Sequence, residues 1–152
     1  MSNTILLVED NQMAVELIIS AFFDREVDLS IQAVQNGNMA LEYILGEGKF
    51  SSRNEYPLPC IILLDLKIPG IDGFGVLKKL KNTPVLKRIP VIIFSSSNSQ
   101  EDIEKCFDLG ANSYIRKPGS FEALLNTIEN IYIYWNSLNV FPSYLQSTLS
   151  MF

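Results

Sequence analysis

Apolar residues follow two alternating patterns along this chain. Short, mostly continuous apolar runs are typical of strands that are covered on both faces of a sheet. Between these runs, apolar residues recur every three or four positions, which is the period of a helix with one buried face. The segments that predict strands are Ile5–Val8, Leu29–Val34, Ile61–Leu64, Val91–Phe94 and Ser113–Ile115.

The periodic segments predict five helices. Residues with N-cap chemistry precede three of them, at Asn11, Asn36 and Ser120, and Gly110 suits the end of a fourth. The helix after Asn11 is expected to bury Ala14, Leu17, Ile18, Ala21 and Phe22. The other helices are predicted over Met39–Leu45, Phe74–Leu80, Gln100–Leu109 and Phe121–Asn136.

Five strands that alternate with five helices predict an α/β fold, a (βα)5 doubly wound sheet of five parallel strands. Connections between parallel strands are right-handed, which places helices on both faces of such a sheet. We expect one domain over residues 1–137 and a C-terminal tail over residues 138–152. The polar connection Gly46–Pro59 is interpreted as a surface excursion and not as a domain boundary.

Composition narrows the class of protein. The chain has 152 residues, of which 47% are hydrophobic, which suits one domain with a core. Its net charge of −5 argues against a general nucleic-acid partner, and no stretch approaches the ~20 apolar residues of a membrane span. The first residues lack the regions of a signal peptide, so a cytoplasmic location is expected. Cys60 and Cys106 are expected to be buried thiols, and histidine is absent.

Polar side chains follow four of the predicted strands at their carboxyl ends. Glu9 and Asp10 close the first strand, Asp65 the third and Ser95 the fourth, while Lys117 lies just beyond the fifth. Open α/β sheets bind ligands at this edge, so we expect these groups to lie close together. The alternative is a set of solvated polar residues without chemistry, and their occurrence at four matching strand ends disfavours it.

The acidic residues predict a cation and, with it, phosphoryl chemistry. Three neighbouring carboxylates repel one another, and Mg²⁺ suits an all-oxygen site, with the backbone C=O of Lys67 as one more ligand on the same rim. Asp65 can then be a nucleophile toward a phosphoryl group. Lys117 would pair with the phosphoryl oxygens, and Ser95 would donate a hydrogen bond to one of them. Such transfer depends on positioning and charge neutralisation, so it needs no histidine in this chain.

Four segments resemble the receiver domain of two-component response regulators. Their order and spacing make the resemblance specific, and it extends over about residues 4–136. The segments are Val8–Asn11, Leu63–Gly73, Ile89–Ser96 and Gly110–Pro118.

This resemblance implies a flavodoxin-like receiver fold and a phosphohistidine on a partner histidine kinase as the phosphodonor. Asp65 would accept the phosphoryl group. Asp10 would bind Mg²⁺ directly and Glu9 through water, although Glu9 stands where an aspartate is commoner. The domain would not be a conventional enzyme, although it would catalyse its own phosphorylation and dephosphorylation.

The resemblance also implies phosphate-binding and switch roles. Lys117, the Ser95 hydroxyl and the backbone N–H of Ser96 would bind the phosphoryl group. Ser95, in place of a frequent threonine, and Tyr114 would form the switch, with the Tyr114 ring outward at rest. The long connection before the third strand and Trp135 near the end of the last helix are similar to single-domain regulators that partner bacterial phytochrome kinases.

Two other function classes stay open. A pseudo-receiver would bind a partner without taking phosphate, but it would normally have lost an acid or the lysine. A phosphohydrolase with an aspartyl intermediate would need an acid two residues after the nucleophile, where this chain has Lys67.

The last predicted helix ends in Ile131–Trp135, which is apolar on all sides. Because such surface usually marks an interface, Ile131, Tyr134 and Trp135 predict a homodimer in which the tail takes part. The alternative is that the tail folds back over this surface. No output domain is recognisable after this helix, so the output is expected to be a downstream protein or a phosphotransfer partner.

Overall fold

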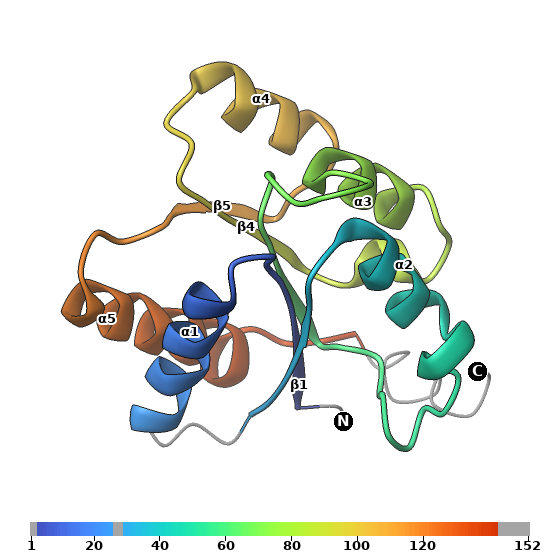
Figure 1. Cartoon of the computed structure of the whole chain (residues 1–152), viewed down its shortest axis with the longest axis horizontal. Coiled ribbons are helices and arrows are strands. Elements are labelled where there is room, and N and C mark those ends of the chain that lie inside the picture. The colour runs from blue at the N-terminus through green and yellow to red at the C-terminus, as the bar shows by residue number, and fades with distance from the viewer. Residues whose placement is uncertain (1–2, 26–28, 143–152) are drawn as a thin grey trace.

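The computed structural model describes residues 3–25 and 29–142, and within them it contains one parallel sheet. The strand order is β2-β1-β3-β4-β5, so the chain reverses direction across the sheet after β2. This confirms the predicted doubly wound fold, which Figure 1 shows with helices on both sides of the strands. The strands are β1 Thr4–Val8, β2 Ser30–Val34, β3 Ile61–Leu64, β4 Val91–Ser95 and β5 Ser113–Arg116.

Helices cover the sheet in two groups, and each group closes its own apolar cluster. One cluster contains side chains of α1 and α5, and the other contains side chains of α2 and α3 with Cys106 of α4. Figure 1 shows α1 beside α5, with α2 and α3 on the other side of the strands. The α-helices are α1 Gln12–Asp24, α2 Gly37–Leu45, α3 Gly73–Lys81, α4 Gln100–Asp108 and α5 Phe121–Tyr132. The 3-10 turns are Gly48–Phe50 and Leu86–Arg88.

Each α-helix begins at a side chain that accepts a hydrogen bond from the backbone of its first turn. Asn11, Asn36 and Ser120 do so as predicted, and Asp72 and Ser99 do the same for α3 and α4. These bonds satisfy backbone donors that a helix leaves unpaired at its start. The caps therefore fix where each loop at the carboxyl edge of the sheet ends.

Two helix predictions were wrong in detail. The buried face of α1 contains Val15, whereas Leu17 is 44% exposed. Both residues fit a spacing of three to four, so the sequence pattern alone did not distinguish them. The last helix was predicted as one α-helix, but the α-helical part ends at Tyr132 and a π-helix follows over Ile133–Leu138. None of the described helices has the length and apolar character needed to cross a membrane.

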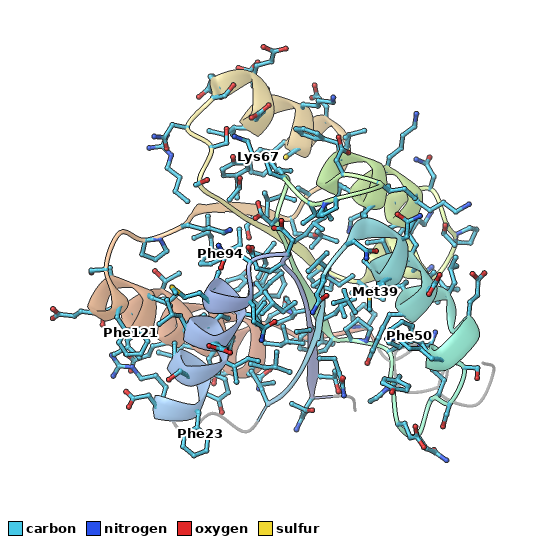
Figure 2. The ribbon with its side chains drawn as sticks, in the orientation of Figure 1. Phe23, Met39, Phe50, Lys67, Phe94 and Phe121 are labelled. Atoms are coloured by element: carbon cyan, nitrogen blue, oxygen red, sulfur yellow. The ribbon has the colours of Figure 1, made fainter. Side chains whose placement is uncertain are left out.

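The connection Gly46–Pro59 is more than a surface excursion, because it closes one end of the core. Phe50 is buried, and its ring centroid lies 5.2 Å from that of Tyr43 and 5.1 Å from that of Tyr56. The Arg53 guanidinium donates to the backbone carbonyls of Tyr43 and Tyr56. Figure 2 shows Phe50 under α2, whereas Phe23 projects from the end of α1.

Candidate functional site

Parallel pairing aligns the ends of four strands. Val8 pairs with Leu64, Leu64 with Ile93, and Ser95 with Arg116. The residues that follow these strands therefore meet at one edge of the sheet, as the sequence predicted.

Three carboxylates form the acidic part of this edge. Glu9 and Asp65 are buried, with 2% and 7% exposure, and Asp10 is exposed. One oxygen from each lies within 4.8 Å of the others. Small hard cations such as Mg²⁺ take oxygen ligands and usually keep several waters, so their sites are partly open to solvent. The cluster therefore fits a divalent metal, with Asp10 on the side open to solvent.

Lys117 joins the two buried acids. Its Nζ lies 2.8 Å from Glu9 Oε2 and 2.8 Å from Asp65 Oδ2. Burial alone lowers the pKa of Lys117, but its bonds to the two carboxylates outweigh burial and raise that pKa. Burial raises the pKa of Glu9; the hydrogen bond from Lys117 lowers it, nearby Asp65 raises it, and the net direction is upward. The ammonium group is thus the counter-charge within the site.

Backbone groups hold the other carboxylate oxygens. The N–H of Asn11 donates to Glu9 Oε1 at 3.2 Å, and the N–H of Lys67 donates to Asp65 Oδ1 at 3.3 Å. Lys67 itself is exposed and lies above the strand ends in Figure 2. Its carbonyl belongs to the same turn as Asp65, which is the position that the sequence suggested for a further metal ligand.

The turn after Asp65 requires glycine at position 73. A Cβ at Gly73 would overlap the backbone carbonyl of Asp65 and approach Leu66 Cα to 2.6 Å. The N–H of Gly73 also donates to the carbonyl of Leu66 at 3.0 Å. The start of α3 therefore packs directly against the backbone of Asp65.

The hydroxyl side of the site lies at the end of β4. Ser95 is fully buried, and its Oγ accepts from the N–H of Ser97 at 3.3 Å. Its carbonyl accepts from the N–H of Lys117 at 2.9 Å. Ser96 is exposed beside it. Tyr114 is half-buried and donates through its hydroxyl to the carbonyl of Ser97 at 3.0 Å, so the ring does not point outward as the resting position was expected to.

Sequence reasoning missed Ser97 and Asp102. The Ser97 hydroxyl donates to Asp102 Oδ2 at 2.7 Å, which ties the loop after β4 to the first turn of α4. A signal was present, because Ser99 and Asp102 have the spacing of a helix start and the loop before them is rich in serine.

The three residues predicted for an interface differ in exposure. Ile131 is buried in the core at 4% exposure, Trp135 is half-buried, and Tyr134 is 52% exposed. The rings of Tyr134 and Trp135 contact edge to face at 4.9 Å. Ile131 thus belongs to the core of this chain, which leaves Tyr134 as the most accessible of the three.

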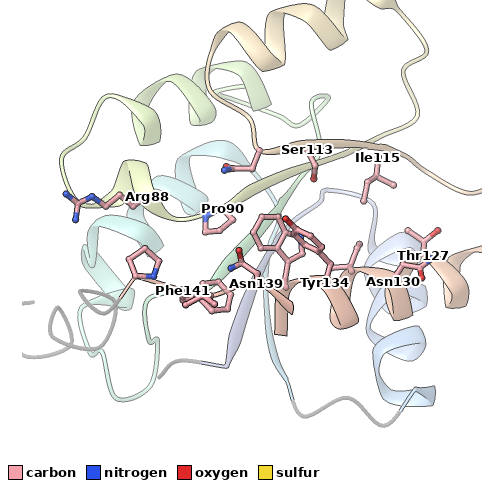
Figure 3. A pocket seen from close by; sticks show the side chains of 14 residues that line it. Arg88, Pro90, Ser113, Ile115, Thr127, Asn130, Tyr134, Asn139 and Phe141 are labelled. Atoms are coloured by element: carbon pink, nitrogen blue, oxygen red, sulfur yellow. The ribbon is translucent and has the colours of Figure 1, made fainter. Parts of the chain in front are cut away.

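A cavity of about 810 Å³ lies beside these aromatic residues, between β5 and the end of α5 (Figure 3). Phe141 lines it and packs against both apolar clusters, so the chain as far as Pro142 turns back toward the sheet. Five of the six large apolar tail residues lie outside the described residues: Tyr144, Leu145, Leu149, Met151 and Phe152.

The fold and the carboxyl-edge site together define a phosphoacceptor receiver of the response regulator class. A sequence model of the response regulator receiver domain matches residues 5–129, which is most of the chain. The chain belongs to this family, and it is a phosphoacceptor response regulator. Members of the family are signalling domains and not conventional enzymes.

Three relatives are similar over nearly their whole length. The probable methanogenesis regulatory protein FilR2 of Methanothrix harundinacea is 40% identical, over 91% of this chain and 86% of FilR2. Response regulator Rcp1 of Synechocystis is 30% identical, over 91% of this chain and 92% of Rcp1. The structure of its Mn²⁺-bound form superimposes with a TM-score of 0.82. The phosphorylated cyanobacterial phytochrome response regulator RcpA has a TM-score of 0.86 at 36% identity, over 94% of this chain and all of RcpA.

Proposed function

We propose that this chain takes a phosphoryl group from a histidine kinase onto Asp65 and thereby switches a protein-interaction face. The observation that carries the proposal is the position of Asp65. It is a buried carboxylate at the end of β3, in contact with Lys117 and within 4.8 Å of two further acids. Receiver-family membership supports a histidine kinase as the donor.

In the transfer step, an Asp65 carboxylate oxygen attacks the phosphorus of a phosphohistidine. The new P–O bond forms as the P–N bond breaks, and the electron pair of that bond returns to the imidazole nitrogen of the kinase. Lys117, 2.8 Å from Asp65 Oδ2, neutralises charge on the acceptor and then on the phosphoryl oxygens. The Ser95 hydroxyl and the N–H of Ser96 donate to the remaining oxygens. Positioning and charge neutralisation account for most of the rate in such a reaction.

We assign Mg²⁺ as the metal. Asp10, which faces solvent, would bind it directly, and Glu9, which is buried, would bind through water. Asp65 and the Lys67 carbonyl would complete the protein ligands. The metal would supply positive charge to the transferring phosphoryl group. The Mn²⁺-bound form of Rcp1 supports a divalent cation at this site. We expect that Mg²⁺ is the cation that binds there in cells.

The kinase would be of the phytochrome type, and both proteins would be cytoplasmic. Similarity to RcpA, a phytochrome response regulator, supports this kinase. FilR2 is named for methanogenesis, so the stimulus of the kinase needs its own test.

The output would be a downstream protein or a phosphotransfer partner, reached through a homodimer whose interface includes Tyr134, Trp135 and the tail. Residues 1–137 would be the receiver and residues 138–152 the interface tail.

Phosphotransfer tests this function directly. A histidine kinase loaded with labelled phosphate should pass its label to the chain in Mg²⁺, and a chelator should stop the transfer. A pseudo-receiver would take no label. A phosphohydrolase would release inorganic phosphate from unrelated phosphate esters, a reaction for which Lys67 replaces the required acid.

A further inference from the structure

Basic residues gather on α3 and on the 3-10 turn Leu86–Arg88 that follows it. Residues 73–100 contain five of the chain's twelve lysines and arginines and none of its seventeen acidic residues, although the whole chain has a net charge of −5. Four of these five side chains are exposed, and together they form what we call the basic face: Lys78, Lys79, Lys87 and Arg88. Among the described residues, no acidic side chain forms a salt bridge with any of the three lysines. The basic face is therefore a local positive region on an acidic molecule.

The fifth cation, Lys81, ties the end of α3 to the turn. Its Nζ donates to the carbonyls of Lys87 and Ile89 at 2.9 and 3.0 Å, and to Asn112 Oδ1 at 3.0 Å. All three partners are uncharged oxygens, so these bonds leave the charge of the ammonium group uncompensated. Burial lowers the pKa of Lys81 to about 8, which leaves the amine mostly protonated at pH 7. Lys81 thus fixes the turn and adds positive charge behind the basic face.

The turn is entered through a strained residue. Val85 has a φ of 72° and a ψ of −54°, and the N–H of Leu86 donates to the carbonyl of Pro84 at 2.9 Å across it. This γ-turn conformation is rare and is unfavourable for a β-branched residue. Such strain persists only where the surrounding structure enforces it, and it is concentrated at functional sites and ligand clamps. The buried side chain of Leu86 and the bonds from Lys81 enforce it in this chain, so the turn has a fixed backbone.

The basic face lies away from the acidic site. Helix α3 begins near Asp65 and runs away from the carboxyl edge of the sheet, and the turn directly precedes β4, so the turn lies toward the opposite edge. Figure 3 shows the Arg88 side chain extending away from the aromatic side chains of the cavity. A partner on the basic face would therefore leave both Asp65 and Tyr134 accessible.

We propose that the basic face binds a short acidic segment of a partner protein. Charge complementarity favours an acidic ligand, and a turn whose backbone is already fixed adds little ordering cost. An extended polyanion, such as a nucleic acid or an anionic membrane, would also approach exposed acids on the neighbouring helices, such as Glu42 of α2 and Glu104 of α4. A short segment stays within the basic face, because exposed charges more than about 10 Å away are largely screened.

Peptide binding tests this proposal. A labelled peptide in which glutamate alternates with serine should bind the unphosphorylated chain at pH 7, as measured by fluorescence anisotropy, and a peptide with glutamine in place of glutamate should not. Lys87→Glu should weaken binding about fivefold, because it turns an exposed attraction into a repulsion. Lys49→Glu is the matched control, since Lys49 is also an exposed lysine in a 3-10 turn, and it should leave the affinity nearly unchanged. Equal weakening by the two variants would overturn the proposal.

A second pair of variants separates the fixed turn from its charge. Lys81→Met removes the buried ammonium group, whereas Lys78→Met removes one exposed charge of the basic face. Lys81→Met should weaken peptide binding more than Lys78→Met does, and it should raise amide hydrogen exchange at Leu86–Arg88. Equal weakening with unchanged exchange would refute the role of the fixed turn. If Lys81→Met does not fold, the comparison of Lys87→Glu with Lys49→Glu still decides whether the basic face binds the peptide.

Other ligands are separate outcomes of the same titrations. Tighter binding of a single-stranded oligonucleotide or of anionic vesicles than of the peptide would overturn the acidic segment as the ligand. Self-association of the parent that Lys87→Glu abolishes would overturn it in favour of a second copy of this chain. None of these measurements uses phosphate, so their failure would leave phosphotransfer to Asp65 untouched, and a failure of phosphotransfer would leave the basic face as proposed.

Discussion

Lys117 determines much of the electrostatics at the candidate site. Its ammonium group lies between two buried carboxylates, at 2.8 Å from each, and its side chain is 23% exposed. A divalent cation at the acidic cluster would share those carboxylates with it. We therefore expect Lys117 to stabilise the metal-free fold and to compete with a bound metal for the same oxygens.

Lys117→Met should make both effects measurable. The free energy of unfolding should fall by about 3 kcal/mol, because two buried acids lose their shared counter-ion; this is the lower end for a broken buried ion pair, since the Lys117 side chain is partly exposed. Mg²⁺ should bind more tightly, because the competing cation is gone. Chemical denaturation and calorimetric titration measure these changes, and Lys67→Met, at an exposed lysine of the next turn, is the control. Weaker Mg²⁺ binding by Lys117→Met would contradict the account.

The two cysteines give a pH-dependent prediction. Both are free and buried, and burial raises the pKa of each thiol to about 11 from an ordinary 9.0. Above pH 9 the unfolded thiols lose protons that the folded thiols keep, so the free energy of unfolding should fall as pH rises from 9 to about 11.

Thiol labelling tests the burial of both cysteines. At pH 8 a thiol reagent should label neither cysteine in the folded chain and both in denaturant. Rapid labelling of Cys60 or Cys106 in the folded chain would contradict their burial.

At the scale of elements, strands were easier to predict than surfaces and loops. Ile61–Leu64 was predicted with its observed bounds, because a buried parallel strand has an unbroken apolar run. The choice between Val15 and Leu17 depended on how α1 is rotated against the sheet, which periodicity fixes only loosely. The burial of Phe50 was not predicted, because it depends on contacts with Tyr43 and Tyr56. Neither contact follows a helical or strand spacing from Phe50, so only the fold brings the three rings together.

The junction between β3 and α3 should not tolerate a side chain at position 73. Gly73→Ala would push a methyl group into the backbone of Asp65 and Leu66, and overpacking of this kind costs about 1–3 kcal/mol. Gly119→Ala is the matched control, because a Cβ there meets nothing within 4 Å. Chemical denaturation compares the two. Equal stability of both variants would mean that the backbone of Asp65 is not held by α3.

At the scale of the whole molecule, the fold separates two surfaces. The acidic site lies at the carboxyl ends of the strands, whereas the cavity beside Tyr134 is also lined by Pro90 and Ser113, next to or at the starts of β4 and β5. The topology and the clustering of the site residues followed from the sequence, because strand ends and parallel pairing fix them. What covers the surface beside Tyr134 did not follow from the sequence. An apolar helix end is equally compatible with a homodimer interface and with a tail that folds back over it.

Sedimentation tests the proposed dimer. The parent should be a homodimer at low micromolar concentration, and Tyr134→Asp should be a monomer that still accepts phosphate, because a charge at the interface would lose its water. Phe23→Asp is the control, since Phe23 is 84% exposed at the far end of α1. A parent that sediments as a monomer in both phosphorylation states would favour a tail that folds back.

The most direct test of the central claim is the site of phosphorylation. After incubation with acetyl phosphate and Mg²⁺, mass spectrometry should find one phosphate per chain, stable in acid and labile in base, as expected of an acyl phosphate. Asp65→Asn should abolish it, whereas Asp72→Asn, at the cap of α3, should leave it in place. Undiminished phosphorylation of Asp65→Asn would contradict the assignment of Asp65 as the phosphoacceptor.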